Sequence, residues 1–200
     1  DEFKSDLTNV LLDVEKDFLK TMFPYFGFLS ESPKPFEIEF HHHPTEINFR
    51  DKKIRIRFYA DDFTEEKFLD SLRIATHSCV HESGHYLHLS SNELSFKIIT
   101  PKPWEIKRKK DRDTYLLREI VAELSALVFF DISRRQLSNE VISHRQHPFS
   151  NAVYDFYLEK GKDYCLKKIK NLATLHLTER DYKDILDIGR KGWCGRLEIK

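Results

Sequence analysis

The chain has few of the residues and patterns that mark disulfide-bonded, membrane-spanning or secreted proteins. Its 200 residues include three cysteines, Cys79, Cys165 and Cys194, an odd number at wide and irregular spacing. That pattern argues against a disulfide framework and indicates a reducing compartment, so we expect a cytoplasmic protein. No apolar run approaches the roughly eighteen residues that a membrane span needs, and the first residues lack the basic-then-apolar order of a signal peptide. We therefore expect no membrane partner.

The chain also lacks net charge. Its 33 basic and 33 acidic side chains cancel, so we expect no nucleic-acid partner; the rival hypothesis is a local nucleic-acid surface on the basic segments 107–110 and 134–135. Glycine is scarce, with six residues, while phenylalanine and tyrosine contribute sixteen and eight. This composition predicts a globular protein with large core side chains. Because 200 residues is an ordinary domain size, we expect a single domain over residues 1–200.

The spacing of apolar residues predicts an α+β fold. Helical periodicity predicts helices over residues 6–22, 64–89, 111–130, 149–172 and 178–188, the last of them closed by Gly189. Between the first two helices, residues 36–40 and 47–59 alternate between apolar and polar side chains, with a break at Asp51 and Lys52. This alternation predicts a hairpin or three short antiparallel strands. The expected architecture is a small antiparallel or mixed sheet with packing helices.

One motif in this pattern is typical of a metal site. Residues 81–85 read His-Glu-Ser-Gly-His, and a helix would place His81 and His85 on one face, one turn apart. Two imidazoles so placed can hold one cation, and Zn²⁺ suits neutral imidazole. Glu82 follows the first histidine, where it can take a proton from a water molecule whose pKa the metal has lowered. We therefore predict one zinc ion per chain, with Glu82 as the general base.

A third ligand is predicted from the helix over residues 111–130. Glu119 and Glu123 lie four residues apart on one face of an otherwise apolar stretch, and buried carboxylates require a cation or a donor. In the favoured assignment Glu119 binds zinc, and Glu123 accepts the second N–H of a ligating histidine and fixes its orientation. The reverse assignment, with Glu123 as the ligand, stays open. A third interpretation makes both residues surface carboxylates balanced by Arg118 or Arg112.

The two segments 81–85 and 119–123 together resemble a known pattern. A His-Glu-x-x-His sequence followed by Glu-x-x-x-Glu on a later helix resembles the gluzincin group of zinc metallopeptidases. In that group an acidic residue, usually Asp, commonly stands four residues after the ligand glutamate, and this chain has Glu123 there. Residues 118–123 also resemble the zincin-like metallopeptidase domain of antirestriction proteins, and the modest size is similar to that of the minigluzincins.

The resemblance covers residues 46–130 and leaves residues 1–45 and 131–200 as helical extensions. It implies a zincin-like fold, a bound zinc ion, and a peptide or protein substrate that lies along the edge of a strand. It also implies peptide-bond hydrolysis, a metallopeptidase activity, with Glu82 as general acid and base. Families of this type include inactive zymogens, so the alternative is a catalytically silent or latent scaffold that acts as a regulatory or interaction module.

Several other residues could take part in the site but have simpler explanations. His77 and His88 flank the motif by about one turn, and packing is the commoner role of such histidines. The triplet at residues 41–43 is expected in a solvated turn, where it could bind metal opportunistically. Cys194 could cap the zinc ion as a thiolate, although an ordinary tail cysteine is the simpler interpretation. Peptide hydrolysis also needs a donor to the developing oxyanion, and four residues are candidates for it: His144, His147, Tyr154 and Tyr157.

Overall fold

The computed structural model describes residues 2–26, 33–43, 45–58, 67–90, 109–134, 150–172 and 179–192. Within these residues the chain forms six α-helices and one three-stranded sheet, so the predicted α+β class is confirmed. The helices are α1 (Glu2–Met22), α2 (Phe68–Ser90), α3 (Lys109–Ile132), α5 (Ser150–Lys160), α6 (Lys162–Leu172) and α7 (Glu179–Gly192), with a short 3-10 helix, η1 (Phe23–Tyr25), after α1. None of these helices is long and apolar enough to cross a membrane.

The sheet is mixed because its last strand inserts between the first two. β1 (Glu37–His41) pairs in parallel with β3 (Lys53–Arg57), and β3 pairs antiparallel with β2 (Glu46–Asn48), which gives the order β1-β3-β2. The predicted hairpin is confirmed by β2 and β3. The alternative of three antiparallel strands is wrong: strand direction alternates along the chain, so a third strand that lies beside the first must run parallel to it.

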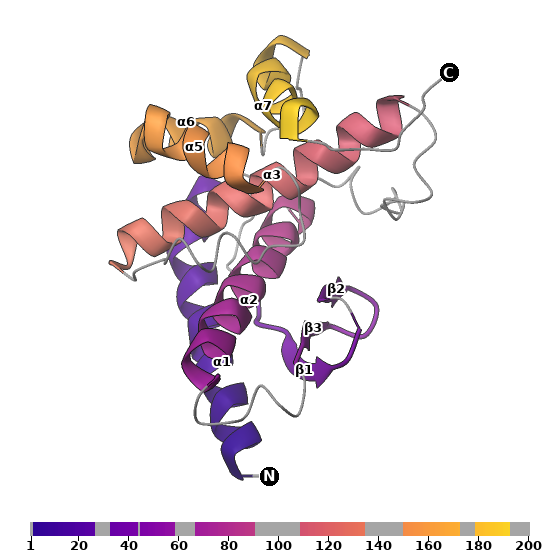
Figure 1. Cartoon of the computed structure of the whole chain (residues 1–200), viewed down its shortest axis with the longest axis vertical. Coiled ribbons are helices and arrows are strands. Elements are labelled where there is room, and N and C mark those ends of the chain that lie inside the picture. The colour runs from indigo at the N-terminus through magenta and orange to yellow at the C-terminus, as the bar shows by residue number, and fades with distance from the viewer. Residues whose placement is uncertain are drawn as a thin grey trace.

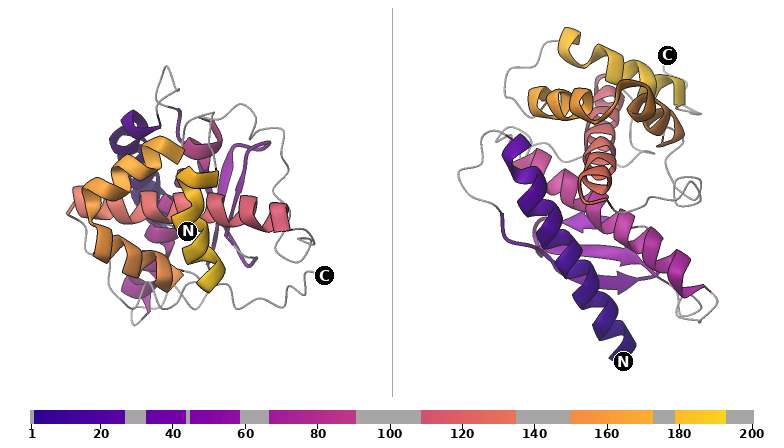
Figure 2. Two further views of the ribbon diagram at one scale, coloured as in Figure 1. Left: turned by 90° about the horizontal axis from the view of Figure 1, so that it is seen from above. Right: turned by 90° about the vertical axis from the view of Figure 1, so that its left-hand side faces the viewer.

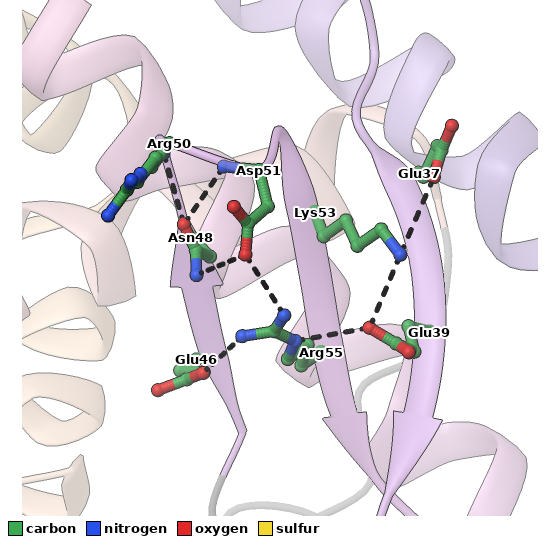
Figure 3. Close-up of polar contacts among 8 residues, drawn as sticks. All are labelled: Glu37, Glu39, Glu46, Asn48, Arg50, Asp51, Lys53 and Arg55. Atoms are coloured by element: carbon green, nitrogen blue, oxygen red, sulfur yellow. Dashed lines mark hydrogen bonds and ion pairs between the residues drawn. The ribbon is translucent and has the colours of Figure 1, made fainter.

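The two faces of the sheet differ in polarity. On the outer face, Arg55 of β3 lies 3.1 Å from carboxylate oxygens of Glu39, Glu46 and Asp51, and so links all three strands (Figure 3). Successive side chains of a strand point to opposite faces, so the residue before Arg55, Ile54, turns inward and is fully buried. The sheet therefore exposes a charged face to solvent and presents an apolar face to the helices.

The helices are stacked on the apolar face of the sheet (Figures 1 and 2). α1 and α2 lie side by side against the sheet, and α2 packs against α3. α5, α6 and α7 cover the side of α3 turned away from α2 (Figure 2). As a result α3 is buried all round over residues 118–130, which explains why this stretch is apolar apart from Arg118, Glu119, Glu123 and Ser125.

One hydrophobic core joins the helices. It contains buried side chains from each of them, among them Phe18 of α1, Val80 of α2, Phe129 of α3, Ile169 of α6 and Ile185 of α7. The rings of Phe18 and Phe129 meet edge to face, with centroids 5.3 Å apart. The helices on either side of the segment with the gluzincin resemblance therefore pack into the same core as α2 and α3.

Two glycines change the predicted helix bounds. A single helix over 149–172 is wrong: the chain breaks into α5 and α6 at Gly161, whose φ of +77° is one that L side chains rarely adopt. Gly189 does not close the last helix, because α7 continues to Gly192. A Cβ atom at position 189 would lie 2.8 Å from Cδ1 of Ile120, so glycine at this position allows α7 to approach α3.

Candidate metal centre

The His-Glu-Ser-Gly-His segment lies in the body of α2 and is buried. His81, Glu82 and His85 are all shielded from solvent by the packing of α2 between the sheet and α3. Residues four apart in a helix share a face, so both histidines turn towards α3, and their ring centroids lie 4.8 Å apart. The structure thus brings the two predicted imidazole ligands together at the contact between α2 and α3.

The facing side of α3 supplies two carboxylates. Nδ1 of His81 lies 3.0 Å from Oε2 of Glu123, and Nε2 of the same ring lies 3.2 Å from Oε2 of Glu119. Nε2 of His85 lies 3.5 Å from Oε1 of Glu119. Glu119 and Glu123 are only 8% and 1% exposed, so their interpretation as surface carboxylates is wrong.

The hydrogen-bonding groups of this cluster suit a bound cation. The carboxylate of Glu123 only accepts, so the Nδ1–H of His81 donates to it, and a neutral ring then carries no proton on Nε2. That Nε2 presents its lone pair to Glu119, which is also an acceptor. A single cation would satisfy Glu119 and both histidines. Protonation of both rings instead would place two positive charges on imidazoles 4.8 Å apart.

The geometry of this group can hold a metal ion. One ligand atom from each of His81, His85 and Glu119 lies within 4.8 Å of the others, and no other such group occurs among the residues that the structure describes. Zinc bonds of about 2.0–2.1 Å at the tetrahedral angle separate neighbouring ligand atoms by about 3.3 Å. Nε2 of His81 lies 3.2 Å from Oε2 of Glu119, and Nε2 of His85 lies 3.5 Å from Oε1 of the same carboxylate, so each histidine is near that separation from one of its oxygens. Three protein ligands also leave a fourth position for water or substrate, as in catalytic zinc sites.

Glu82 is held beside this group in a setting that favours the protonated form. Burial raises the pKa of its carboxyl, His85 and His81 lower it, and Glu119 and Glu46 raise it again, with a net upward shift. A carboxylate with a raised pKa is a stronger base, so this environment suits a general base. The edge strand β2 packs against α2, the helix that carries Glu82.

The histidines that flank the motif are buried. The ring of His77 stacks on Phe130 with centroids 6.0 Å apart, and its Nε2 lies 3.5 Å from Oε2 of Glu123. His88 hydrogen-bonds the backbone of Leu172 at the end of α6, and burial lowers its pKa to about 3, so the ring is neutral. The packing role predicted for both residues agrees with these positions.

Gly84 sets the distance between the two helices. A Cβ atom at this position would lie 2.9 Å from Cα of Ala122 and 3.0 Å from its carbonyl oxygen. Ordinary carbon–carbon contacts are about 3.5–4.0 Å, so only glycine allows α2 and α3 to approach this closely. The sequence showed Gly84 as an unspecified position of the motif, and its role depends on a residue 38 positions away, in a different helix.

Tyr115 is a second residue that the sequence did not single out. It lies on α3 one turn before Glu119 and is buried. Burial raises the pKa of its phenol, and the charges of Glu119 and Glu82 raise it further, so both carboxylates act on this side chain. The spacing of four residues from Glu119 is the signal that could have identified it.

The other predicted residues lie elsewhere. Tyr157 of α5 donates a hydrogen bond to Asp131 at 2.5 Å, and Asp131 is about 18 Å of helix beyond Glu119. Tyr154 also lies on α5, across α3 from α2 (Figure 2), so neither tyrosine joins the metal-binding group. The following residues named from the sequence lie outside the described residues: Lys107, Arg108, Arg135, His144, His147 and Cys194.

Comparisons of the chain with known protein families, with curated protein sequences and with solved structures found no significant match. Evidence about the function of this site therefore comes from its own residues and their geometry.

Proposed function

We propose that this chain is a zinc-dependent hydrolase that cleaves peptide bonds on a zincin-like scaffold. His81, His85 and Glu119 would hold one zinc ion, and Glu82 acts as the general base. The observation that carries the proposal is the convergence of three ligand atoms within 4.8 Å in a buried site, with the carboxylate of Glu82 beside them. The gluzincin-like order of the same residues supports a peptide bond as the target.

The residues of the site have separate tasks. A bound zinc ion would supply a Lewis acid that polarises a carbonyl group and lowers the pKa of water. Glu82 takes the proton from the attacking water and passes it to the leaving amine, and its raised pKa suits both transfers. Glu123 accepts the Nδ1–H of His81 and so keeps Nε2 of that ring turned towards Glu119.

β2 is well positioned to receive an extended peptide. In the order β1-β3-β2 it is an edge strand, so one side of its backbone has no neighbouring strand within the described sheet. An extended peptide can pair with such an edge through main-chain hydrogen bonds. β2 also packs against α2, the helix that carries Glu82. These facts support a peptide or protein substrate that lies along β2 and passes the general base.

The alternative is a catalytically silent scaffold that serves as a regulatory or interaction module. Structural zinc sites are closed by four protein ligands, whereas the group here has three among the described residues. A structural site also has no need for a buried carboxylate such as Glu82 next to the ligands. Both features favour the enzyme.

The test is peptide hydrolysis by zinc-loaded protein, measured on a library of internally quenched peptides. Glutamine has the size of glutamate but cannot act as a base, so we expect Glu82→Gln to lower kcat about 10²- to 10⁴-fold with zinc content unchanged. Glu159→Gln makes the same chemical change at an exposed position of α5 and should keep full activity.

Two outcomes would contradict the proposal. A wild-type protein that holds zinc but cleaves no peptide would favour the silent scaffold. Activity that survives Glu82→Gln would remove this residue from the mechanism.

A further inference from the structure

Tyr115 lies on the stripe of α3 that faces α2. Helical spacing aligns Tyr115 with Glu119 and Glu123, at intervals of four residues. Contacts confirm that this face of α3 is turned towards α2, because Glu119 and Glu123 both contact His81 of α2. The side chain of Tyr115 therefore leaves α3 on the same side as the metal-binding carboxylates.

The pairing of the two helices places Tyr115 at one end of the site. Along α2, His77 and His81 meet Glu123, whereas His81 and His85 meet Glu119, so α2 and α3 run antiparallel. One more turn in the same direction leads from Glu119 to Tyr115. Tyr115 thus flanks the predicted metal ligands on the side opposite His77 and its stacking partner.

The surroundings of Tyr115 make its hydroxyl a donor. The side chain is 5% exposed, and the carboxylates of Glu119 and Glu82 both act on it. A tyrosine hydroxyl keeps its proton at neutral pH, because its ordinary pKa is about 10. The hydroxyl is therefore a proton-bearing group close to both the predicted ligand and the predicted base.

Hydrolysis of a peptide bond requires such a donor. Negative charge develops on the carbonyl oxygen, and a preorganised donor stabilises it. The carboxylates of Glu119 and Glu123 only accept, the imidazoles face those two carboxylates, and Glu82 is assigned to the water and the leaving amine. Arg118 is a second buried donor on α3, and its charge interacts with both Glu119 and His88. It lies about 100° round the helix from Glu119, whereas Tyr115 lies one turn before Glu119 on the face that meets α2.

We propose that the hydroxyl of Tyr115 donates a hydrogen bond to the carbonyl oxygen of the bound substrate as negative charge develops there. The phenol keeps its proton throughout, so Tyr115 stabilises the transition state without transferring a proton. This inference rests on the proposed hydrolase function. It assigns the oxyanion donor to a residue that precedes the third ligand in the chain.

The first experiment compares wild type, Tyr115→Phe and Tyr164→Phe in the zinc-loaded form. Tyr164 is an exposed tyrosine on α6 that bonds Asp184, so its variant is a matched control for loss of a hydroxyl. We expect Tyr115→Phe to lower kcat about 10²- to 10³-fold with KM nearly unchanged, and Tyr164→Phe to match the wild type. Zinc affinity should be equal in all three proteins.

The second experiment needs no hydrolysis. The cobalt-substituted proteins are titrated with benzylphosphonate and with benzyl mercaptan, and binding is followed by the visible spectrum of cobalt. Benzylphosphonate presents oxyanions to the metal site, and the thiolate does not. A hydrogen bond to a charged group contributes about 10- to 100-fold in affinity, so Tyr115→Phe should weaken phosphonate binding by this factor and leave thiolate binding unchanged.

The two experiments separate this inference from the proposed function. If the wild type hydrolyses no peptide, the proposed function fails, while the phosphonate comparison still decides the role of Tyr115. The inference is overturned if Tyr115→Phe weakens the binding of both ligands equally or of neither. It is also overturned if this variant lowers the zinc affinity, because Tyr115 would then be a positioning residue for Glu119. Failure of the wild type to bind phosphonate would also overturn it.

Discussion

Replacement of Gly84 by alanine should damage the proposed zinc site through the backbone of α3. The new Cβ would lie 2.9 Å from Cα of Ala122. Relief of this contact to about 3.5–4.0 Å requires α2 and α3 to separate by about 0.6 to 1.1 Å. Metal sites tolerate errors in bond length of only about 0.2 Å, so the bonds to Glu119 on one helix and to His85 on the other could not both be kept.

Two effects on stability partly cancel in Gly84→Ala. Overpacking of a tight contact costs about 1–3 kcal/mol. Alanine in a helix interior is more favourable than glycine by about 0.8–1 kcal/mol. We therefore expect a net loss of about 0–2 kcal/mol, so the protein still folds, while the zinc affinity falls roughly 10- to 100-fold.

The assays are competition with a zinc chelator for affinity and urea unfolding for stability. Ser83→Ala is the matched control, because it changes the adjacent buried position of the motif and removes only the hydroxyl that donates to the Cys79 carbonyl within α2. The double variant Gly84→Ala with Ala122→Gly should not recover zinc binding, since the two nearest atoms belong to the backbone of residue 122. Wild-type zinc affinity in Gly84→Ala would refute this reasoning.

Three further changes have defined outcomes. Glu123→Gln should lower zinc affinity about 10- to 100-fold in the chelator assay, and an unchanged affinity would show that Glu123 does not support His81. Burial raises the pKa of Glu15 from 4.5 to about 7, against the hydrogen bond that it accepts from the N–H of Phe36. The folded state binds the carboxyl proton of Glu15 more tightly than the unfolded state does, so zinc-free wild type should lose about 3 kcal/mol of stability as pH rises from 4.5 through 7. Glu15→Gln should not show this loss. The same pH dependence of urea unfolding in both proteins from about pH 5 to 8 would contradict this expectation. Asp113 accepts hydrogen bonds of 2.6 and 3.3 Å from Arg190 of α7. Asp113→Asn should therefore lower the free energy of unfolding, measured in urea, by about 1.5–3 kcal/mol. An unchanged urea midpoint would disprove this expectation.

The helices of the site could be predicted from the sequence because their signals are local. Apolar periodicity located α2 and α3, and any helix that contains residues 81–85 places His81 and His85 on one face. The convergence of Glu119 on these histidines could only be inferred from the pattern of residue types. It depends on the packing of α2 against α3, which spacing within a single helix does not determine.

Features that depend on distant contacts were left open or missed. The parallel pairing of β1 with β3 follows from the insertion of β3 between β1 and β2. The alternation of apolar residues along each strand would be the same if β2 were the central strand. Tyr115 has the appearance of an ordinary core residue unless α3 is known to face the metal ligands. Gly161 falls within an otherwise helical pattern, so its positive φ was not visible in the periodicity.

The most direct test of the metal site is the zinc content of the untagged protein by elemental mass spectrometry. Wild type should hold about one zinc ion per chain after incubation with zinc and dialysis, and both His85→Ala and Glu119→Ala should lose it. His43→Ala should keep it, because this exposed histidine lies after β1 and tests opportunistic binding by the triplet. A wild type without zinc, or variants at positions 85 and 119 that retain it, would contradict the three-ligand site.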